Sequence, residues 1–496
     1  MITNITIEDI LEEVKKSNEE SIPGILKAYE YALKVHGTQT RKSGELYISH
    51  PIYVAYLLST LKADTDTICA ALLHDVIEDG ENITIEDIEA CFGETTAILV
   101  DGVTKMKLDL FPNKEAQNNA NTRKVIMGIK TDVRIIIIKL VDRLHNMMTL
   151  EYLPRNKQIQ NALETLEIFV PLAKHLGLHQ IKNILEELSF KYLNQELYNL
   201  IEYEKNLHIQ DKQYSLDQTK ENITRKLNQL SIENTINCRF KRNYSIYKTL
   251  SPTKIPADLL KITINDIEPY LKIDSNNIHD LQSLKIVVQN LEDCYYSLEL
   301  LQKEYDIIPG KIKDCISLPK TNGYQSIHTT ILNTFNEIIQ TQIRTNDMDL
   351  KDSLGIASYW QTKPEEALVY MQQELTKKFP FFQSLLEIDK TFEKDYDFIS
   401  QIKTEILAEM IYPKTKYGKI VELPKGATIM DFASQQLDTL DNQIIAIVNG
   451  KVVSLNHILK TKDIVDLIQI SNQQLPNKPY PVVTTKAKQK IKSLNY

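Results

Sequence analysis

The chain has 496 residues, too many for one ordinary domain, and this length predicts about three domains. Hydrophobic residues make up 42% and charged residues 25%, a balance that supports sizeable buried cores, and no apolar run approaches the roughly 20 residues of a membrane-spanning helix. The net charge of −8 argues against general binding of DNA, and five scattered cysteines without a CxxC pair indicate reduced, buried thiols in a cytoplasmic protein.

The first 200 residues predict helices. Residues 22–37 and 48–61 carry apolar side chains at helical spacing, and the earlier segment ends at a glycine. Residues 133–147 are ambiguous because they contain four consecutive isoleucines, Ile135–Ile138, which prefer strands. The length of the segment and the lack of an internal turn signal favour a buried helix over a strand.

The middle of the chain, from about residue 235, alternates short β-branched runs with a helical pattern at residues 291–305. This alternation predicts an α+β domain that ends near Trp360. A small unit of strands, turns and one helix follows, and the last residues show no convincing element. The predicted boundaries are 1–200 for the helical domain, 201–365 for the α+β domain, 366–405 for a helical connection, 406–470 for the small unit and 471–496 for a tail.

Two histidines and two aspartates stand out in the helical domain: His50, the adjacent pair His74 and Asp75, and Asp142. Two imidazole nitrogens with two carboxylate oxygens suit an octahedral ion such as Mn²⁺ better than tetrahedral zinc. Glu78 follows one turn after His74 on a continuing helix, a position suited to proton transfer.

A structural interpretation competes with this one. A single histidine in a helical domain is usually a structural residue, and we assign four others in this way: His36, His175, His179 and His208. Adjacent acids such as Glu78 and Asp79 usually form a solvated face. The combination of all these residues across a hundred helical positions favours the metal site.

Several segments of the helical domain resemble hydrolase signatures of the RelA/SpoT homologues, which make and degrade the alarmone (p)ppGpp: RKSGELYISHP, AALLHDVIEDG and IKLVDRLHNMMTL. The resemblance implies an all-α domain of the HD phosphohydrolase type. It implies that Mn²⁺ is held by His50, His74, Asp75 and Asp142, and that water is activated or placed by Glu78 and Asp79. It further implies substrate contacts from Arg41, Lys42 and Ser43 to the guanine, and from Asn146 and Thr149 near the ribose and phosphates.

The α+β domain resembles the nucleotidyltransferase-like synthetase domain of the same family, through RFKRNYSIYKTL, GKIKDCISLPKTNGYQSIHTTI and IIQTQIRT. The resemblance implies that Asp280 is a carboxylate ligand of Mg²⁺ and that the acceptor guanine stacks on Tyr324. It also implies further nucleotide or phosphate contacts from Lys241, Lys248, Lys313, His328 and Arg344.

This domain departs from the family pattern where the chemistry takes place. Gln340 stands at the position of the second metal carboxylate, and an amide brings no charge. Lysine replaces arginine at 285 and 311, and Asp349 and Asp352 replace a histidine and an alanine. We therefore predict an inactive synthetase site, with Mg²⁺ bound only if the site works. The alternative is a divergent but active site in which Glu337 substitutes, although a shift of three residues turns Glu337 to the other face of a strand.

Residues 406–470 resemble a TGS domain, a small β-grasp unit that touches tRNA on the ribosome in long family members. The carrying segments are KYGKIVELPKGATIMDFAS and AIVNGKVVSL. The histidine expected at the tRNA contact is Leu437 here, and the chain ends at Tyr496, before the C-terminal regions of long members. A tRNA or ribosome contact is therefore not expected, and a purely structural unit is the alternative.

Our leading hypothesis is a cytoplasmic, Mn²⁺-dependent enzyme that hydrolyses the 3′-pyrophosphate of (p)ppGpp to GDP or GTP and pyrophosphate. One alternative is a bifunctional (p)ppGpp synthetase and hydrolase. The other is a non-catalytic regulator that binds the alarmone. Guanine nucleotides are the expected partners, and neither a membrane nor DNA is expected.

Overall fold

The computed structural model describes residues 5–250, 256–263, 266, 281–319, 324–363, 366–378, 380–440, 442–475 and 479–494. The chain forms two compact units. Unit 1 contains residues 1–104 and 128–374, and unit 2 contains residues 105–127 and 375–496. No helix in the described ranges has both the length and the apolar character needed to cross a membrane.

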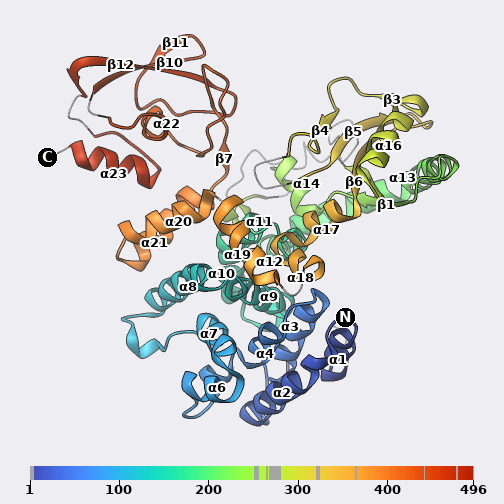
Figure 1. Cartoon of the computed structure of the whole chain (residues 1–496), viewed down its shortest axis with the longest axis vertical. Helices are drawn as coiled ribbons and strands as arrows, with labels where there is room; N and C mark the ends of the chain where they lie inside the picture. The colour runs from blue at the N-terminus through green and yellow to red at the C-terminus, as the bar shows by residue number, and fades with distance from the viewer. Residues whose placement is uncertain are drawn as a thin grey trace. The chain divides into compact units, whose positions relative to one another are not determined.

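Helices make up most of the N-terminal part of unit 1 (Figure 1). Their bounds are α1 (Ile7–Lys15), α2 (Ile22–His36), α3 (Ser49–Thr60), α4 (Thr65–Leu73), α5 (Val76–Asp79), α6 (Ile85–Phe92), α7 (Glu94–Val103), α9 (Arg134–Met148), α10 (Arg155–Glu164), α11 (Val170–His175), α12 (His179–Leu193) and α13 (Gln195–Gln229). Helix α8 (Lys114–Thr131) runs from unit 2 into unit 1. The domain boundary expected at residue 200 falls inside α13, which continues across it.

Helix α9 lies at the centre of the helical region, where it packs against α3, α7 and α12. Its four isoleucines are each at most 2% exposed, and the helix expected from segment length is confirmed. Burial on all sides makes the strand preference of isoleucine irrelevant here, because tertiary packing outweighs intrinsic propensity. Helix α4 is likewise buried from Thr67 to Leu73. His74 and Asp75 follow the end of α4 directly, and Asp142 lies in the middle of α9. These two helices thus place three of the four predicted metal ligands.

A mixed sheet forms the second half of unit 1, in the order β1-β2-β6-β5-β3, with β4 paired to β5. Strands β2 and β6 are parallel and the other pairs are antiparallel. The bounds are β1 (Asn234–Phe240), β2 (Gln282–Val288), β3 (Asp306–Ile307), β4 (Lys313–Asp314), β5 (Ile327–Leu332) and β6 (Ile338–Thr345), with helices α14 (Asn243–Leu250), α16 (Leu291–Glu304), α17 (Asn346–Leu354) and α18 (Tyr359–Thr362).

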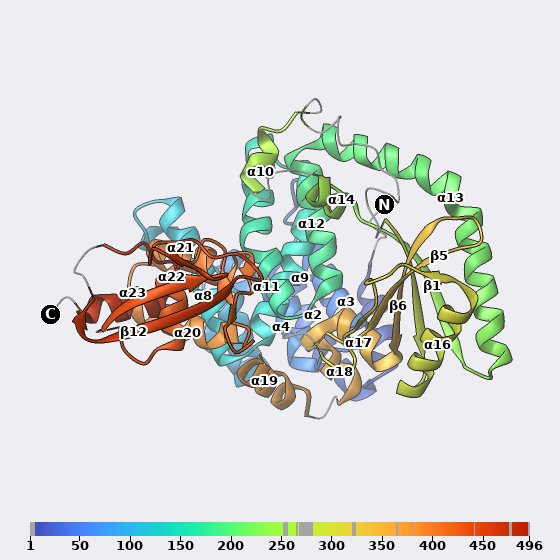
Figure 2. The same ribbon diagram turned by 90° about the horizontal axis from the view of Figure 1, so that it is seen from above.

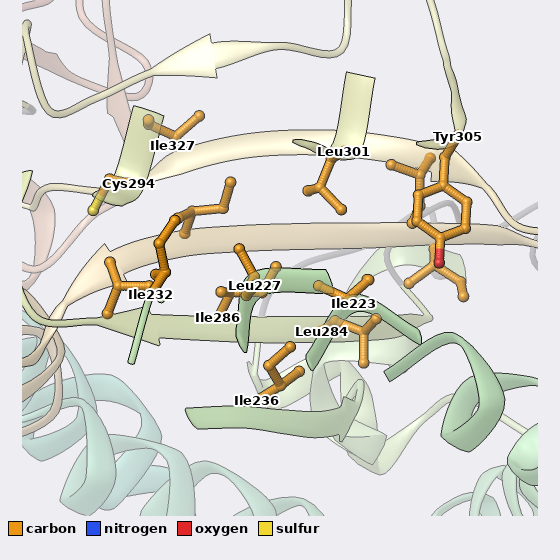
Figure 3. Close-up of a cluster of buried hydrophobic side chains, with 14 of the residues drawn as sticks. Ile223, Leu227, Ile232, Ile236, Leu284, Ile286, Cys294, Leu301, Tyr305 and Ile327 are labelled. Atoms are coloured by element: carbon orange, nitrogen blue, oxygen red, sulfur yellow. The ribbon is translucent and has the colours of Figure 1, made fainter. Parts of the chain in front are cut away.

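Helices α13 and α16 cover one face of this sheet (Figure 2). Figure 3 shows the resulting core, in which Ile223 and Leu227 of α13 and Leu301 of α16 pack against Leu284 and Ile286 of β2. Because side chains alternate along a strand, the opposite face carries Ser283 and Lys285 of β2 and Gln340, Gln342 and Arg344 of β6. Of the predicted nucleotide residues, His328, Gln340 and Arg344 lie on that opposite face.

Unit 2 contains a second sheet, in the order β11-β10-β12-β8, and a β7–β9 pair. Its elements include α20 (Pro380–Thr391), α21 (Asp395–Gln401), β7 (Met410–Ile411), β8 (Lys414–Thr415), β9 (Leu423–Pro424), α22 (Ile429–Gln436), β10 (Asn442–Val448), β11 (Lys451–Val453), β12 (Ile464–Gln474) and α23 (Thr485–Leu494), and α19 (Ala367–Lys378) leads into it from unit 1. The order of a helical region, a mixed α and β region and a small β-rich unit confirms the predicted fold class.

The tail differs from the sequence prediction, which placed no element after residue 470. Strand β12 continues to Gln474, and residues 485–494 form helix α23. The helix is rich in lysine and was not evident from hydrophobic periodicity. It is held by tertiary contacts at its start, where the buried carboxylates of Asp431 and Glu405 accept backbone N–H groups of Thr484 and Thr485 at 2.8 Å.

Candidate active site

The two predicted histidine and two predicted aspartate ligands converge in the helical region. His50 lies in the first turn of α3, and His74 and Asp75 occupy the break between α4 and α5. Asp142 lies in the middle of α9. The two Nε2 atoms are 3.2 Å apart, and Asp142 Oδ1 lies 3.1 Å from His50 Nε2. Asp75 Oδ2 lies 3.3 Å from His74 Nε2.

Both histidines present a lone pair to the centre of this cluster. His74 Nδ1 donates to the carbonyl of Ala71 at 2.8 Å, which leaves Nε2 without a proton. His145 Nδ1 accepts from Arg41, so the proton in its 2.6 Å contact with His50 Nδ1 belongs to His50. Electron pairs from two imidazoles and two carboxylates therefore face one another, which favours a cation between them.

The spacing fits a divalent ion. Ligands at about 2.1 Å around an octahedral ion lie about 3 Å apart, and ligand atoms of His50, His74 and Asp142 all lie within 4.8 Å of one another. The four residues are buried, with exposures of 2–6%. This set of donors, two nitrogens and two carboxylates, suits a divalent metal.

The surroundings hold His50 and Asp142 in their metal-binding forms. Burial lowers the pKa of His50. Burial acts against the ionised form of Asp142, but Lys139, His50 and His74 outweigh it and keep the pKa of this carboxyl well below its usual range. Lys139 Nζ and Asn146 Nδ2 donate to the two oxygens of Asp142 at 2.8 and 2.6 Å. Neutral imidazoles and ionised carboxylates are the protonation states that bind cations.

Glu78 and Asp79 lie on the one-turn helix α5, which begins directly after Asp75, and both residues are exposed. Helical spacing predicted Glu78 on a continuation of the preceding helix, but that helix ends at Leu73 and a new turn begins at Val76. Burial, and then the charge of Asp75, raise the pKa of Asp79, whose side chain is 32% exposed. A half-exposed carboxyl with a raised pKa is suited to accept a proton from water.

Three of the five predicted substrate residues meet at one edge of the cluster. The Arg41 guanidinium donates to Asn146 Oδ1 and Thr149 Oγ1, both at 3.3 Å. Ser43 lies farther along the loop, where its hydroxyl donates to Glu45 at 3.4 Å, and the side chain of Lys42 is exposed. The structure therefore groups Arg41 with the α9 residues and leaves the other two on the loop.

Sequence reasoning missed two residues of this site, Tyr47 and His145. Tyr47 donates its hydroxyl to Asp75 Oδ2 at 2.8 Å. His145 lies between Arg41 and His50, and burial, followed by His50 and Arg41, lowers its pKa to about 2. Both lie three residues from a predicted ligand in the sequence, and for His145 on α9 this spacing is the signal that identifies a neighbour on one helix face.

Among the predicted nucleotide residues, Tyr324 contacts both His328 and Arg344 on the face of the mixed sheet opposite to α13 and α16. Tyr324 Oη lies 2.7 Å from His328 Nε2 and accepts from Arg344 at 3.0 Å. Gln340 on β6 pairs with Ser283 and Thr330 on the neighbouring strands.

The other predicted nucleotide residues are more scattered. Lys241 follows β1, Lys313 is exposed on β4 opposite His328, and Lys248 Nζ contacts Glu186 of α12 at 2.9 Å. Asp280 lies outside the described residues.

Carboxylates of this chain neutralise two of the basic groups on this face. Lys285 Nζ lies 2.8 Å from both oxygens of Asp349, and Arg344 contacts Asp352 at 2.5 Å. Both aspartates are among the departures from the family pattern. These ion pairs occupy donor atoms of both basic side chains.

Glu337 lies on the wrong side of the sheet to replace Gln340. Its carboxylate contacts Lys212 Nζ at 3.1 Å and accepts a hydrogen bond from Ser215, and both partners belong to α13 on the covered face. The alternation of side chains along a strand explains this placement, since the two positions differ by three residues.

Comparison with known proteins identifies three family regions in the chain. They are described as an HD domain at residues 28–179, a region found in RelA/SpoT proteins at residues 238–367 and a TGS domain at residues 409–469.

Relatives that align with nearly the whole of this chain also indicate this family. The chain is 36% identical over 480 residues to the bifunctional (p)ppGpp synthase/hydrolase SpoT of Escherichia coli K12, which covers 96% of this chain and 65% of the relative. It is 35% identical over 474 residues to a GTP pyrophosphokinase of Myxococcus xanthus, covering 94% and 60%. It is 35% identical over 500 residues to a guanosine-3′,5′-bis(diphosphate) 3′-pyrophosphohydrolase of Aquifex aeolicus, covering 98% and 67%. The chain thus spans 60 to 67% of the length of these relatives and belongs to the RelA/SpoT family.

Proposed function

We propose that this protein is a Mn²⁺-dependent hydrolase that removes the 3′-pyrophosphate of (p)ppGpp, and that its synthetase-like site is inactive. The observation that carries the proposal is the convergence of His50, His74, Asp75 and Asp142 with both histidine lone pairs directed inward. The names of the relatives include hydrolase and synthetase activities. Each of these two activities therefore needs its own evidence in this chain.

The proposed reaction adds water to the phosphorus that is attached to the 3′ oxygen. The bond between this phosphorus and the 3′ oxygen breaks, and the products are pyrophosphate and a nucleotide with a free 3′ hydroxyl. A divalent ion, when bound, supplies Lewis-acid chemistry by lowering the pKa of water and polarising phosphoryl oxygens.

The protein's own residues supply the other parts. Glu78 or Asp79 takes the proton from the attacking water, a contribution of roughly 10²–10⁴-fold for general-base catalysis. Arg41, fixed between Asn146 and Thr149, provides a cation for the phosphates or the base at the edge of the cluster. Asp142, whose pKa stays well below its usual range because of Lys139, His50 and His74, and Asp75 would hold the metal.

The proposal of an inactive synthetase site has three supports. Gln340 provides no charge for a second metal ion, and Glu337 faces the other side of the sheet. Asp349 and Asp352 already neutralise Lys285 and Arg344. Phosphoryl transfer depends on charge placed around the triphosphate, so each loss lowers the rate.

Two incubations of the purified chain test the proposal. The first contains Mn²⁺ and ppGpp, and the second contains Mg²⁺, ATP and GDP. We expect pyrophosphate release in the first and no ppGpp formation in the second. Product in both would establish a bifunctional enzyme, and product in neither would indicate a regulator that only binds the alarmone. Asp75→Ala should abolish hydrolysis with the chain still folded, and a fully active variant would refute the metal assignment.

We predict that Gln340→Glu alone does not restore synthesis. The new carboxylate returns one charge, but Lys285 and Arg344 remain paired with aspartates. The measurement is ppGpp formation from ATP and GDP. A matched variant that also carries Asp349→His and Asp352→Ala removes these pairs. We expect more ppGpp formation from this triple variant than from Gln340→Glu alone. Robust synthesis by the single variant would show that the aspartate pairs do not block the site.

A further inference from the structure

His36, the last residue of α2, is buried against the candidate active site and was assigned a structural role from the sequence alone. Its side chain is 1% exposed. The ring stacks on Tyr47, with centroids 4.8 Å apart and planes inclined by 27°. Nδ1 lies 3.3 Å from Gln39 Oε1 and 3.9 Å from Asp79 Oδ2. The imidazole therefore faces one of the two proposed proton-transfer carboxylates.

The hydrogen bonding of His36 does not suit a residue that only fills space. Both oxygens near Nδ1 are acceptors, so this nitrogen carries the proton. Nε2 is buried and has no hydrogen-bond partner within the described part of the chain. Burying an unpaired nitrogen costs free energy that an apolar ring of the same size would avoid. The N–H of the imidazole is the feature that such a ring lacks.

His36 acts on two carboxylates of the site. Nδ1–H hydrogen-bonds to Gln39 Oε1 at 3.3 Å and lies 3.9 Å from Asp79 Oδ2. The ring stacks on Tyr47, whose hydroxyl donates to Asp75 Oδ2 at 2.8 Å. His36 and Tyr47 also oppose the rise in the pKa of Asp79 that burial and Asp75 cause. The His36 imidazole therefore faces Asp79, a proposed base, and stacks on Tyr47, which donates to the proposed metal ligand Asp75.

We propose that His36 is a positioning residue of the hydrolase, which orients the Asp79 carboxylate through Nδ1–H. This inference rests on the proposed hydrolase function. The 3.9 Å separation is longer than a hydrogen bond, and such contacts often shorten when substrate binds.

Two substitutions separate orientation from packing. In His36→Asn, the amide nitrogen can take the place of Nδ1 and keep a donor toward Asp79, although the ring is lost. In His36→Phe, the ring and its stacking on Tyr47 remain, but the donor is absent. A purely structural role predicts that the phenylalanine variant is the more active of the two, and orientation predicts the reverse.

The measurements are kcat and KM for ppGpp hydrolysis by the full chain, Mn²⁺ affinity by electron paramagnetic resonance, and the thermal midpoint. We expect His36→Phe to lower kcat by at least about tenfold, with KM, Mn²⁺ affinity and the thermal midpoint close to wild type. We expect His36→Asn to recover most of that loss. His457→Phe, at an exposed position of unit 2, is the control and should match wild type.

The outcomes distinguish this inference from the function on which it rests. Wild-type protein that fails to hydrolyse ppGpp with Mn²⁺ overturns both. Active wild type with an equally active His36→Phe overturns only the role of His36. Because phenylalanine fits the same buried space, its result decides the question even if the asparagine variant does not fold.

Discussion

Burial separates the cysteines of this chain into reactive and unreactive thiols. All five are free, but Cys91 is exposed and Cys238 is partly exposed, so the expectation of five buried thiols was wrong for these two. Cys91 lies near the end of α6, where the helix turns its polar side to solvent. The sequence pattern predicts that Cys91 lies on a helix. Whether its thiol is buried depends on which side of that helix packs against neighbouring helices.

We predict that a thiol reagent at pH 8 labels Cys91 rapidly and labels Cys69 and Cys294 only after unfolding. Burial raises the pKa of both buried thiols to about 12, so they stay protonated at this pH, and the thiolate is the reactive form. Time-resolved labelling of native protein measures this order. Cys91→Ser should remove the fast phase, and a fast phase that survives in this variant would contradict the prediction.

The residues of the candidate site divide by the kind of signal they leave in the sequence. His50, His74, Asp75 and Asp142 stand in motifs, and their residue types and spacing were enough to single them out. His36 could not be found in this way, because its role arises from the packing of the end of α2 against the turn after α4, which hydrophobic spacing does not encode. Tyr47 is similar: the sequence places it near His50, but only the fold brings its hydroxyl to Asp75.

Backbone contact between two glycines joins the helical region of unit 1 to the segment after its sheet. Gly355 follows α17 with φ +52°, and the N–H of Ile356 donates to the carbonyl of Leu176 at 3.0 Å. A Cβ on Gly355 would lie 2.3 Å from that carbonyl oxygen, and one on Gly177 would lie 2.9 Å from Gly355 Cα. Only glycine permits this approach at both positions.

We predict that Gly355→Ala destabilises unit 1 more than Gly310→Ala. Both glycines have positive φ, which costs alanine about 1–2 kcal/mol, but a Cβ on Gly310 meets no atom within 4 Å. The overlap with Leu176 and Gly177 should add roughly 1–3 kcal/mol at Gly355. Urea denaturation of the two variants gives the difference in the free energy of unfolding. Equal losses of unfolding free energy in the two variants would show that the segment around Gly355 moves away from Leu176 and Gly177 without cost.

Elements were predictable where a hydrophobic pattern was long and were missed where a few polar contacts hold them. Helix α9 was recognised in spite of its four isoleucines because its length excluded a strand. Helix α23 was not, because its sequence is mostly lysine and polar, and its position depends on the carboxylates of Glu405 and Asp431. A carboxylate that accepts backbone N–H groups from a distant segment leaves no local signal.

The division into two units gives the metal proposal a test at the scale of the whole molecule. All four proposed ligands lie in unit 1, and none of the residues of the cluster belongs to unit 2. A ligand that binds only the native state stabilises the part of the chain that forms its site. Metal binding should therefore act unequally on the two units.

We predict that Mn²⁺ raises the unfolding transition of unit 1 and leaves that of unit 2 unchanged. At a free concentration 100 times its Kd, the gain in the free energy of unfolding should be about 2.7 kcal/mol. Differential scanning calorimetry with and without Mn²⁺ measures the shift, and a chelator should reverse it. Asp75→Ala should show both transitions without the shift, since one carboxylate ligand is gone. A shift that persists in this variant, or that appears in the unit 2 transition, would place the ion elsewhere.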